Sequence, residues 1–226
     1  MIAAVVLALG IGTVIGSNTQ NTTAANEDPA TTASPSAESN ALADLARRDD
    51  ADPFAMGAVD APVVIIEYAD FTCKYCGAFA EETLPTLIEE YIDAGHVRME
   101  WRDTPILSES SVSTAIAGRA AAQQDLFWQF YEVLYAHTYT GDGDFSRDRL
   151  LALAGEVDGL DLAAFETGLD DPELAAAVEQ EGSQSRALGV TSTPTFVVGE
   201  QVIQGAQPIE VFRQIIDAQL EEETSQ

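Results

Sequence analysis

Hydrophobic and polar residues follow two different periods along this chain, and together they predict a mixed α/β domain that begins near residue 55. An apolar, largely β-branched run at residues 63–68 predicts a strand buried on both faces, and residues 97–103 predict a second strand. Between them, apolar residues at helical spacing predict a helix over residues 73–91, kinked at Pro85 because proline removes a backbone hydrogen bond. This strand–helix–strand order favours parallel strands joined by a right-handed crossover.

The stretch from residue 107 to residue 188 has helical periodicity almost throughout. It divides into shorter helices where a helix breaker intervenes, at Gly155, Gly159, Gly168 and Pro172. One helix is dense in aromatic residues, which we interpret as core rather than as a peptide groove: Phe127, Trp128, Phe130, Tyr131 and Tyr135. Residues 195–198 and 201–204 predict a β-hairpin, and residues 208–220 predict a closing helix. An all-helical block is therefore expected inside an α/β frame.

The segment before this domain has a different composition. Residues 1–16 are apolar and uncharged, too short for a spanning helix of about 20 residues but typical of a signal or anchor segment. Because no basic residue precedes the apolar run, we expect that segment to be truncated at its start. Residues 17–54 are rich in Asn, Thr, Ala, Ser and Pro and predict a flexible tether, followed by the folded domain at residues 55–222. A leader and tether of this kind predict an extracytoplasmic location, either anchored or secreted, where disulfides persist.

Length and charge narrow the possible functions. The 226 residues, 46% of them hydrophobic, suffice for one well-buried domain. The formal net charge is −28, from 38 acidic and 10 basic residues, which disfavours binding to nucleic acid or to anionic lipid. We interpret this acidity as a solvated surface suited to high salt; an acidic recognition patch is the alternative.

The chemistry of the chain is concentrated in its two cysteines. Cys73 and Cys76 lie where the first strand pattern gives way to the helix pattern, so both sulfurs belong to the first turn of that helix. Free backbone N–H groups and the helix dipole favour a thiolate there, which suits reversible disulfide chemistry. A structural disulfide would close only a very small loop and restrain little chain entropy. A zinc site needs four ligands, and only His96 and His137 could complete it, so we predict no metal site.

The order of these elements resembles the thioredoxin fold, and specifically its DsbA-like extracytoplasmic branch, over residues 57–220. The stretches that carry the resemblance are residues 60–63, 67–76, 126–130, 189–196 and 205–208, which include the Cys-x-x-Cys motif and the Thr193-Pro194 dipeptide. The resemblance implies a thioredoxin-like α/β fold with an all-helical insertion, at about residues 107–189, between the second strand and the C-terminal hairpin.

The resemblance also implies roles for single residues. Cys73 is expected to be the nucleophile and Cys76 the resolving thiol, with Lys74 and Tyr75 between them tuning the redox potential. Pro194 is expected in the cis form facing the dithiol, with Thr193 presenting its backbone to a peptide. Glu67, an acid inside an apolar strand, is expected to have a raised pKa and to exchange a proton with Cys76. An edge-facing or locally paired glutamate is the alternative.

Together these expectations describe a thiol-disulfide oxidoreductase that donates the Cys73–Cys76 disulfide to reduced secreted proteins. Its re-oxidant would be a membrane quinone-linked protein of the DsbB or vitamin-K-epoxide-reductase type, and we expect a monomer without a bound cofactor. A thiol reductase or isomerase on the same fold is one alternative, and the direction of electron flow stays open. A tethered peptide-binding module with a structural disulfide is the other.

Overall fold

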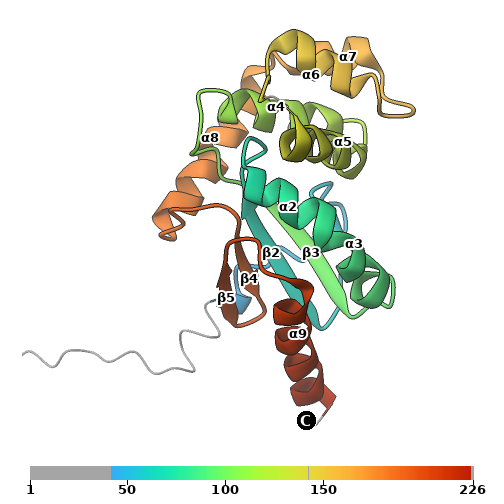
Figure 1. Cartoon of the computed structure of the whole chain (residues 1–226), viewed down its shortest axis with the longest axis vertical. Helices are drawn as coiled ribbons and strands as arrows, with labels where there is room; N and C mark the ends of the chain where they lie inside the picture. Colours follow the sequence, from blue (N-terminus) through green and yellow to red (C-terminus); the bar gives the residue numbers. More distant parts are fainter. Residues whose placement is uncertain (1–41, 142, 225–226) are drawn as a thin grey trace, which may run out of the picture. The chain divides into compact units, whose positions relative to one another are not determined.

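The computed structural model describes residues 42–141 and 143–224 and contains a five-stranded mixed sheet (Figure 1). The strands lie in the order β1-β3-β2-β4-β5. Their bounds are β1 Ala55–Met56, β2 Val63–Ala69, β3 Val97–Asp103, β4 Thr195–Val198 and β5 Gln201–Gln204. The central pair β2 and β3 is parallel, as predicted, and the other pairs are antiparallel. The two long strands and the hairpin lie within one residue of their predicted bounds, whereas the short edge strand β1 was not predicted.

The helix predicted over residues 73–91 is divided into three parts. Helix α2 (Lys74–Glu82) ends at Thr83, α3 (Leu84–Leu87) follows, and the π-helix η1 (Ile88–Ile92) completes the crossover to β3. Pro85 lies in the first turn of α3, where its missing N–H is not needed. In a continuous helix the same residue would interrupt the hydrogen-bond ladder, so Pro85 explains why α2 ends where it does.

Five helices form the predicted insertion between β3 and β4. They are α4 (Ser111–Ala122), α5 (Phe127–Thr140), α6 (Arg147–Ala154), α7 (Leu162–Gly168) and α8 (Pro172–Ala187), and α9 (Ile209–Thr224) closes the chain. Helices α4 to α7 group together beyond the end of the sheet where α2 begins (Figure 1). Helix α5 packs directly on α2. A Cβ on Gly77 would lie 3.1 Å from the Cβ of Tyr139, so a glycine at this position of α2 permits the close approach.

The main core lies between one face of the sheet and helices α2, α4, α5 and α9. Its largest fully buried side chains include Trp101, Tyr131, Tyr135, Phe71, Phe79, Phe127, Phe196 and Phe212. Strand β3 alternates in this core, because Val97, Met99 and Trp101 face it while the residues between them face the opposite side of the sheet. The five aromatic residues of α5 that the sequence assigned to the core pack there, whereas a sixth, Tyr139, is exposed.

The opposite face of the sheet is covered in part by the start of the segment at residues 42–54, which the sequence assigned to the flexible tether. Leu42, Leu45 and Ala46 pack there against a second core of Val64, Ile66, Tyr68 and Val197. This segment has only three large apolar residues, Leu42, Leu45 and Phe54, and it differs from the tether before it in being rich in Asp and Arg. The predicted leader at residues 1–16 and the rest of the tether lie outside the described residues. In the described ranges, no helix is long and apolar enough to cross a membrane.

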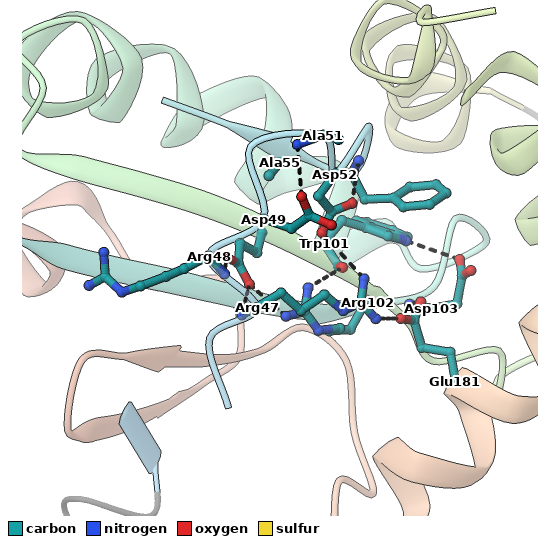
Figure 2. Close-up of polar contacts among 12 residues, drawn as sticks. Arg47, Arg48, Asp49, Ala51, Asp52, Ala55, Trp101, Arg102, Asp103 and Glu181 are labelled. Carbon is teal, nitrogen blue, oxygen red and sulfur yellow. Dashed lines mark hydrogen bonds and ion pairs between the residues drawn. The ribbon is translucent and has the colours of Figure 1, made fainter. Parts of the chain in front are cut away.

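Charged groups fix this N-terminal segment (residues 42–54) to the sheet (Figure 2). The buried Glu100 of β3 accepts hydrogen bonds from the backbone N–H groups of Arg47, at 2.9 Å, and Arg48, at 3.0 Å. It also pairs with Arg98 at 3.0 Å and with Arg102 at 2.6 Å. One carboxylate therefore joins the chain entering the domain to its central sheet.

Candidate active site

The two cysteines lie at the start of α2, directly after the turn that leaves β2. Cys73 is the N-cap residue, with φ −85° and ψ 116°, and Cys76 is in the first turn of the helix. They are not joined in a disulfide and both are buried, with 4% of Cys73 and none of Cys76 exposed. The structure therefore confirms that both sulfurs belong to the helix start.

Asp70 shapes the turn that presents Cys73, and sequence reasoning missed it. Its backbone carbonyl accepts a hydrogen bond from the Cys73 N–H at 2.9 Å, and its carboxylate accepts one from the Thr72 N–H at 2.9 Å. The second carboxylate oxygen accepts the N–H groups of Ile106 and Leu107, from the loop after β3. Asp70 is buried, so it ties the dithiol turn to the next crossover. An aspartate two residues before a threonine N–H is typical of an Asx turn, the one signal that could have indicated this role.

The two thiols have opposite electrostatic environments. A hydrogen bond from Cys76 lowers the pKa of the Cys73 thiol to about 6, despite burial, and the backbone N–H groups of Cys76 and Tyr75 act in the same direction. These N–H groups are among the donors that a helix N-terminus leaves without a partner inside the helix. Burial raises the pKa of Cys76 well above its ordinary value, and its bond to Cys73 adds to that rise. At neutral pH the pair therefore holds a thiolate at Cys73 and a thiol at Cys76.

The loop before β4 faces Cys73. The Thr193–Pro194 peptide bond is cis, as the resemblance implies, and the Cys73 thiol donates to the Thr193 carbonyl oxygen at 3.3 Å. The Thr193 hydroxyl is buried without a hydrogen-bond partner in the described part of the chain. Thr193 also lowers the pKa of Cys73, which indicates that this hydroxyl is placed to donate a hydrogen bond to the Cys73 thiolate. Main-chain and side-chain groups of one residue thus lie against the reactive sulfur.

Glu67 lies in the central strand β2 and faces the main core, not an edge. Its neighbours across the sheet are Trp101 on β3 and Phe196 on β4. The side chain is fully buried, and burial raises the pKa of its carboxyl to about 8. The Tyr131 hydroxyl donates to its Oε2 at 3.2 Å. Sequence reasoning missed Tyr131, because an aromatic residue on a helix gives no indication of what its hydroxyl contacts.

The two residues between the cysteines point outward. Lys74 is exposed, and Tyr75 is exposed over 71% of its surface. Tyr75 acts on Cys73 through its backbone N–H. In the described ranges, no three His, Cys, Asp or Glu side chains are grouped as metal ligands. Tuning of the redox potential by the side chains of Lys74 and Tyr75 stays a prediction.

The sequence of this chain is similar to those of known thioredoxin-like proteins. A family model described as Thioredoxin matches residues 49–218. The probable disulfide bond formation protein D of Bacillus cereus is 30% identical over 148 residues, which cover 64% of this chain and 68% of that protein. This chain belongs to the DsbA-like branch of the thioredoxin family. Members of this branch are thiol-disulfide oxidoreductases, which require substrate proteins and a re-oxidant.

Solved structures show the same fold. Oxidised BdbD from Bacillus subtilis superposes with a TM-score of 0.67 at 23% identity, covering 74% of this chain and 92% of that one. Wolbachia pipientis α-DsbA1 gives a TM-score of 0.66 at 22% identity, covering 75% and 91%. These DsbA-type structures confirm the thioredoxin-like fold with a helical insertion.

One set of relatives has a different name. The Na(+)/H(+) antiporter NhaA 3 of Salinispora tropica is 34% identical over 158 residues, which cover 69% of this chain and 23% of the antiporter. This DsbA-like chain thus spans about a quarter of that relative's length. The likeness concerns only the portion of the antiporter that is matched.

Proposed function

We propose that this DsbA-like chain is an extracytoplasmic oxidant that donates the Cys73–Cys76 disulfide to reduced secreted proteins. The observation that carries the proposal is the difference between the two thiols. The pKa of Cys73 is lowered to about 6 and that of Cys76 is raised well above its ordinary value. Interactions that favour the Cys73 thiolate stabilise the reduced protein, and a stabilised reduced form makes the disulfide a stronger oxidant. A thiol of low pKa is also the better leaving group in exchange.

The proposed reaction has two exchanges. A client thiolate attacks the Cys73 sulfur of the oxidised protein, the Cys73–Cys76 bond breaks, and Cys76 leaves and takes up a proton. A second client thiolate then attacks the client sulfur of the mixed disulfide, and Cys73 leaves as a thiolate. The client loses two electrons and gains a disulfide, while the protein gains two electrons and becomes the dithiol. The Thr193 backbone lies against Cys73, where it would meet the client segment next to the attacking sulfur.

Location and re-oxidation complete the proposal. The apolar leader predicted at residues 1–16 would place the domain outside the cytoplasm, as an anchored or secreted protein. There the reduced dithiol would pass its electrons to a membrane quinone-linked re-oxidant of the DsbB or vitamin-K-epoxide-reductase type. Labelling intact cells with a membrane-impermeant maleimide, after mild reduction, should modify Cys73. Protection of Cys73 until the cells are lysed would contradict this location.

A redox titration tests the direction of exchange. The protein should equilibrate with glutathione at a potential above about −200 mV, the oxidising end of the range for this fold. In the same buffer, the oxidised protein should convert a reduced two-cysteine client to its disulfide. A Cys73→Ser variant, which cannot form a mixed disulfide at that position, is the control. A potential near −270 mV would indicate a reductase instead. A bridge that resists glutathione and leaves the client reduced would indicate a binding module.

A further inference from the structure

We propose that Tyr131 is a positioning residue for the exchange reaction: its hydroxyl holds the Glu67 carboxyl so that Oε1 is the atom that exchanges a proton with Cys76. The inference rests on the proposed thiol-disulfide exchange at Cys73 and Cys76. It assigns a chemical role to the helical insertion, because Tyr131 comes from α5 whereas Glu67 and the cysteines come from β2 and α2.

The two carboxyl oxygens of Glu67 are not equivalent. Oε2 accepts the Tyr131 hydroxyl at 3.2 Å, whereas Oε1 is buried and has no hydrogen-bond partner among the described residues. An unpartnered polar atom in a core costs free energy, so its retention calls for an explanation. Proton exchange supplies one, because an acid that must gain and lose a proton needs one oxygen free of a fixed donor.

The position of Tyr131 is fixed by its surroundings. Its ring meets Trp101 edge-on, with centroids 5.6 Å apart, and Tyr135 in the same manner at 4.6 Å. Only 1% of the residue is exposed. Burial raises the pKa of Tyr131 well above its ordinary value, so the hydroxyl stays protonated and keeps the proton that it donates to Glu67. Because the Tyr131 hydroxyl donates to Oε2, that oxygen acts as the carbonyl acceptor. The acidic proton of a neutral Glu67 is therefore on Oε1.

The groups that face this carboxyl come from two helices. Helix α2 contributes Cys73 and Cys76, and α5 contributes Tyr131 and Tyr135, all coupled electrostatically to Glu67. The residues paired with Glu67 in the sheet, Trp101 and Phe196, carry no charge. Glu67 is neutral near pH 7 because its pKa is about 8, and the hydrogen bond from Tyr131 works against the rise due to burial. Loss of this bond should therefore raise the pKa further.

The proton transfer accompanies the opening of the disulfide. When a client thiolate bonds to the Cys73 sulfur, the Cys73–Cys76 bond breaks and the electron pair goes to the Cys76 sulfur. The Cys76 thiolate takes the proton from Glu67 Oε1, which becomes a carboxylate that still accepts Tyr131 at Oε2. Glu67 regains a proton from water before the next cycle. In the reverse direction the carboxylate takes the proton from Cys76.

The chain offers a matched control one helical turn along. Tyr135 is on the same helix and is fully buried, but its hydroxyl donates to the backbone carbonyl of Asp70 at 3.2 Å. Tyr131→Phe and Tyr135→Phe therefore each remove one hydroxyl and one buried hydrogen bond from the same core. Only the first removes a donor from Glu67, so the two variants separate a general loss of stability from a specific effect on the proton.

The experiment measures the rate at which a single-thiol peptide opens the oxidised protein, from pH 6 to 10. Each rate is divided by the thiolate fraction of the peptide. The wild-type profile should show a midpoint at the pKa of Glu67 in the oxidised protein, which burial raises above its ordinary value. Tyr131→Phe should raise that midpoint by about one pH unit and slow opening at neutral pH by roughly tenfold. Tyr135→Phe should keep the wild-type midpoint. An unchanged midpoint in Tyr131→Phe, or an equal shift in both variants, overturns the proposal.

Two further measurements keep the outcome unambiguous. Glu67→Gln should abolish the midpoint of the wild-type profile, and its persistence would show that the proton is not on Glu67, which also overturns the proposal. In the wild-type protein, the infrared C=O stretch of neutral Glu67 should have the lowered frequency of a hydrogen-bonded carbonyl; a free-carbonyl frequency contradicts the Tyr131 contact without any variant. A reductase-like potential would refute donation to secreted proteins while leaving the Tyr131 shift intact, so the two failures are distinguishable.

Discussion

Cys73 is a reactive thiol because it lies at the start of a helix, where the Cys76 thiol and nearby backbone N–H groups lower its pKa. At the N-cap of α2 it faces backbone N–H groups that no other atom of the helix can satisfy. Cys76, one turn further, is surrounded by the core, so burial raises its pKa and outweighs the backbone hydrogen bond from Asp70. Two identical side chains three positions apart thus acquire opposite acidities from local structure alone.

The largest contribution to the acidity of Cys73 can be removed by one substitution. A hydrogen bond from Cys76 is the main cause that lowers the pKa of Cys73 to about 6, against an ordinary value of 9.0. We therefore expect Cys76→Ala to move the midpoint of Cys73 ionisation upward from about 6, toward 9.0. Titration of the thiolate by ultraviolet absorbance measures this directly.

Lys74→Gln provides the comparison for that titration. The Lys74 side chain is exposed, and exposed charges act weakly through water and salt, so its removal should move the midpoint by less than about half a unit. If Cys73 still ionised near pH 6 in the Cys76→Ala variant, or if Lys74→Gln shifted the Cys73 midpoint more than Cys76→Ala does, the charge of Lys74 would outweigh the hydrogen bonds at this sulfur.

The residues of the site differ in how far the sequence could predict them. Cys73, Cys76 and Pro194 each belong to a short local motif, and the helix start and the cis bond were predicted correctly. Tyr131 and Asp70 act through contacts with distant segments, at 3.2 Å to Glu67 and 2.9 Å to the Ile106 N–H. Contacts of this kind depend on how α5 and the β3–α4 loop pack, which local periodicity does not encode.

The same limit applies to the elements. Strands β2 and β3 were predicted within one residue because a strand between two covered faces has a strong local pattern. The N-terminal segment was not predicted, since it is held by a few apolar side chains and by polar contacts of Arg47 and Arg48 with distant residues. Strand β3 does carry a signal of this contact. Arg98, Glu100 and Arg102 alternate with apolar residues on a strand that is buried throughout. Such a charged alternation requires a polar partner on that face.

The attachment of the N-terminal segment to the sheet can be tested by a substitution at Glu100. Glu100→Gln would leave Arg98 and Arg102 buried near each other without their carboxylate. Breaking a buried ion pair from one side costs about 3 to 5 kcal/mol, so we expect the free energy of unfolding to fall by that order. The segment at residues 42–54 should also become accessible to protease. Chemical denaturation and limited proteolysis measure the two effects.

The pH dependence of this loss has a definite sign. Burial alone would raise the pKa of Glu100. The hydrogen bonds from Arg47, Arg102 and Arg48 outweigh burial and lower this pKa from 4.5 to about 2. Its contribution to stability is complete above pH 4.5 and is lost as the pH falls toward 2. The wild-type and Glu100→Gln proteins should therefore converge in stability across that window. Glu179→Gln, in an exposed pair with Arg186, should change stability by under about 1 kcal/mol, and an equal loss there would contradict the argument.

The distribution of charge over the whole chain is uneven. Of the 10 basic residues, Arg47, Arg48, Arg98, Arg102 and Arg119 lie in the contacts around the N-terminal segment and β3, where Arg119 pairs with Asp103 and Glu181. This leaves 10 − 5 = 5 basic residues for the rest of a chain of net charge −28. The cations are thus concentrated where they hold the fold together, and the remaining surface carries an excess of carboxylates that repel one another.

That repulsion predicts a dependence of stability on salt. Potassium chloride screens exposed charges over about 10 Å at 0.1 M and 3 Å at 1 M, so the midpoint of thermal unfolding should rise steadily over this range. A variant with Glu109, Glu200 and Glu222 replaced by Gln removes three exposed charges and should need less salt to reach the same midpoint. The buried pairs of Glu100 are screened far less, so their contribution should hardly change as salt is added. A midpoint that does not respond to salt in either protein would show that the acidity does not limit stability, and would leave an acidic recognition patch as its explanation.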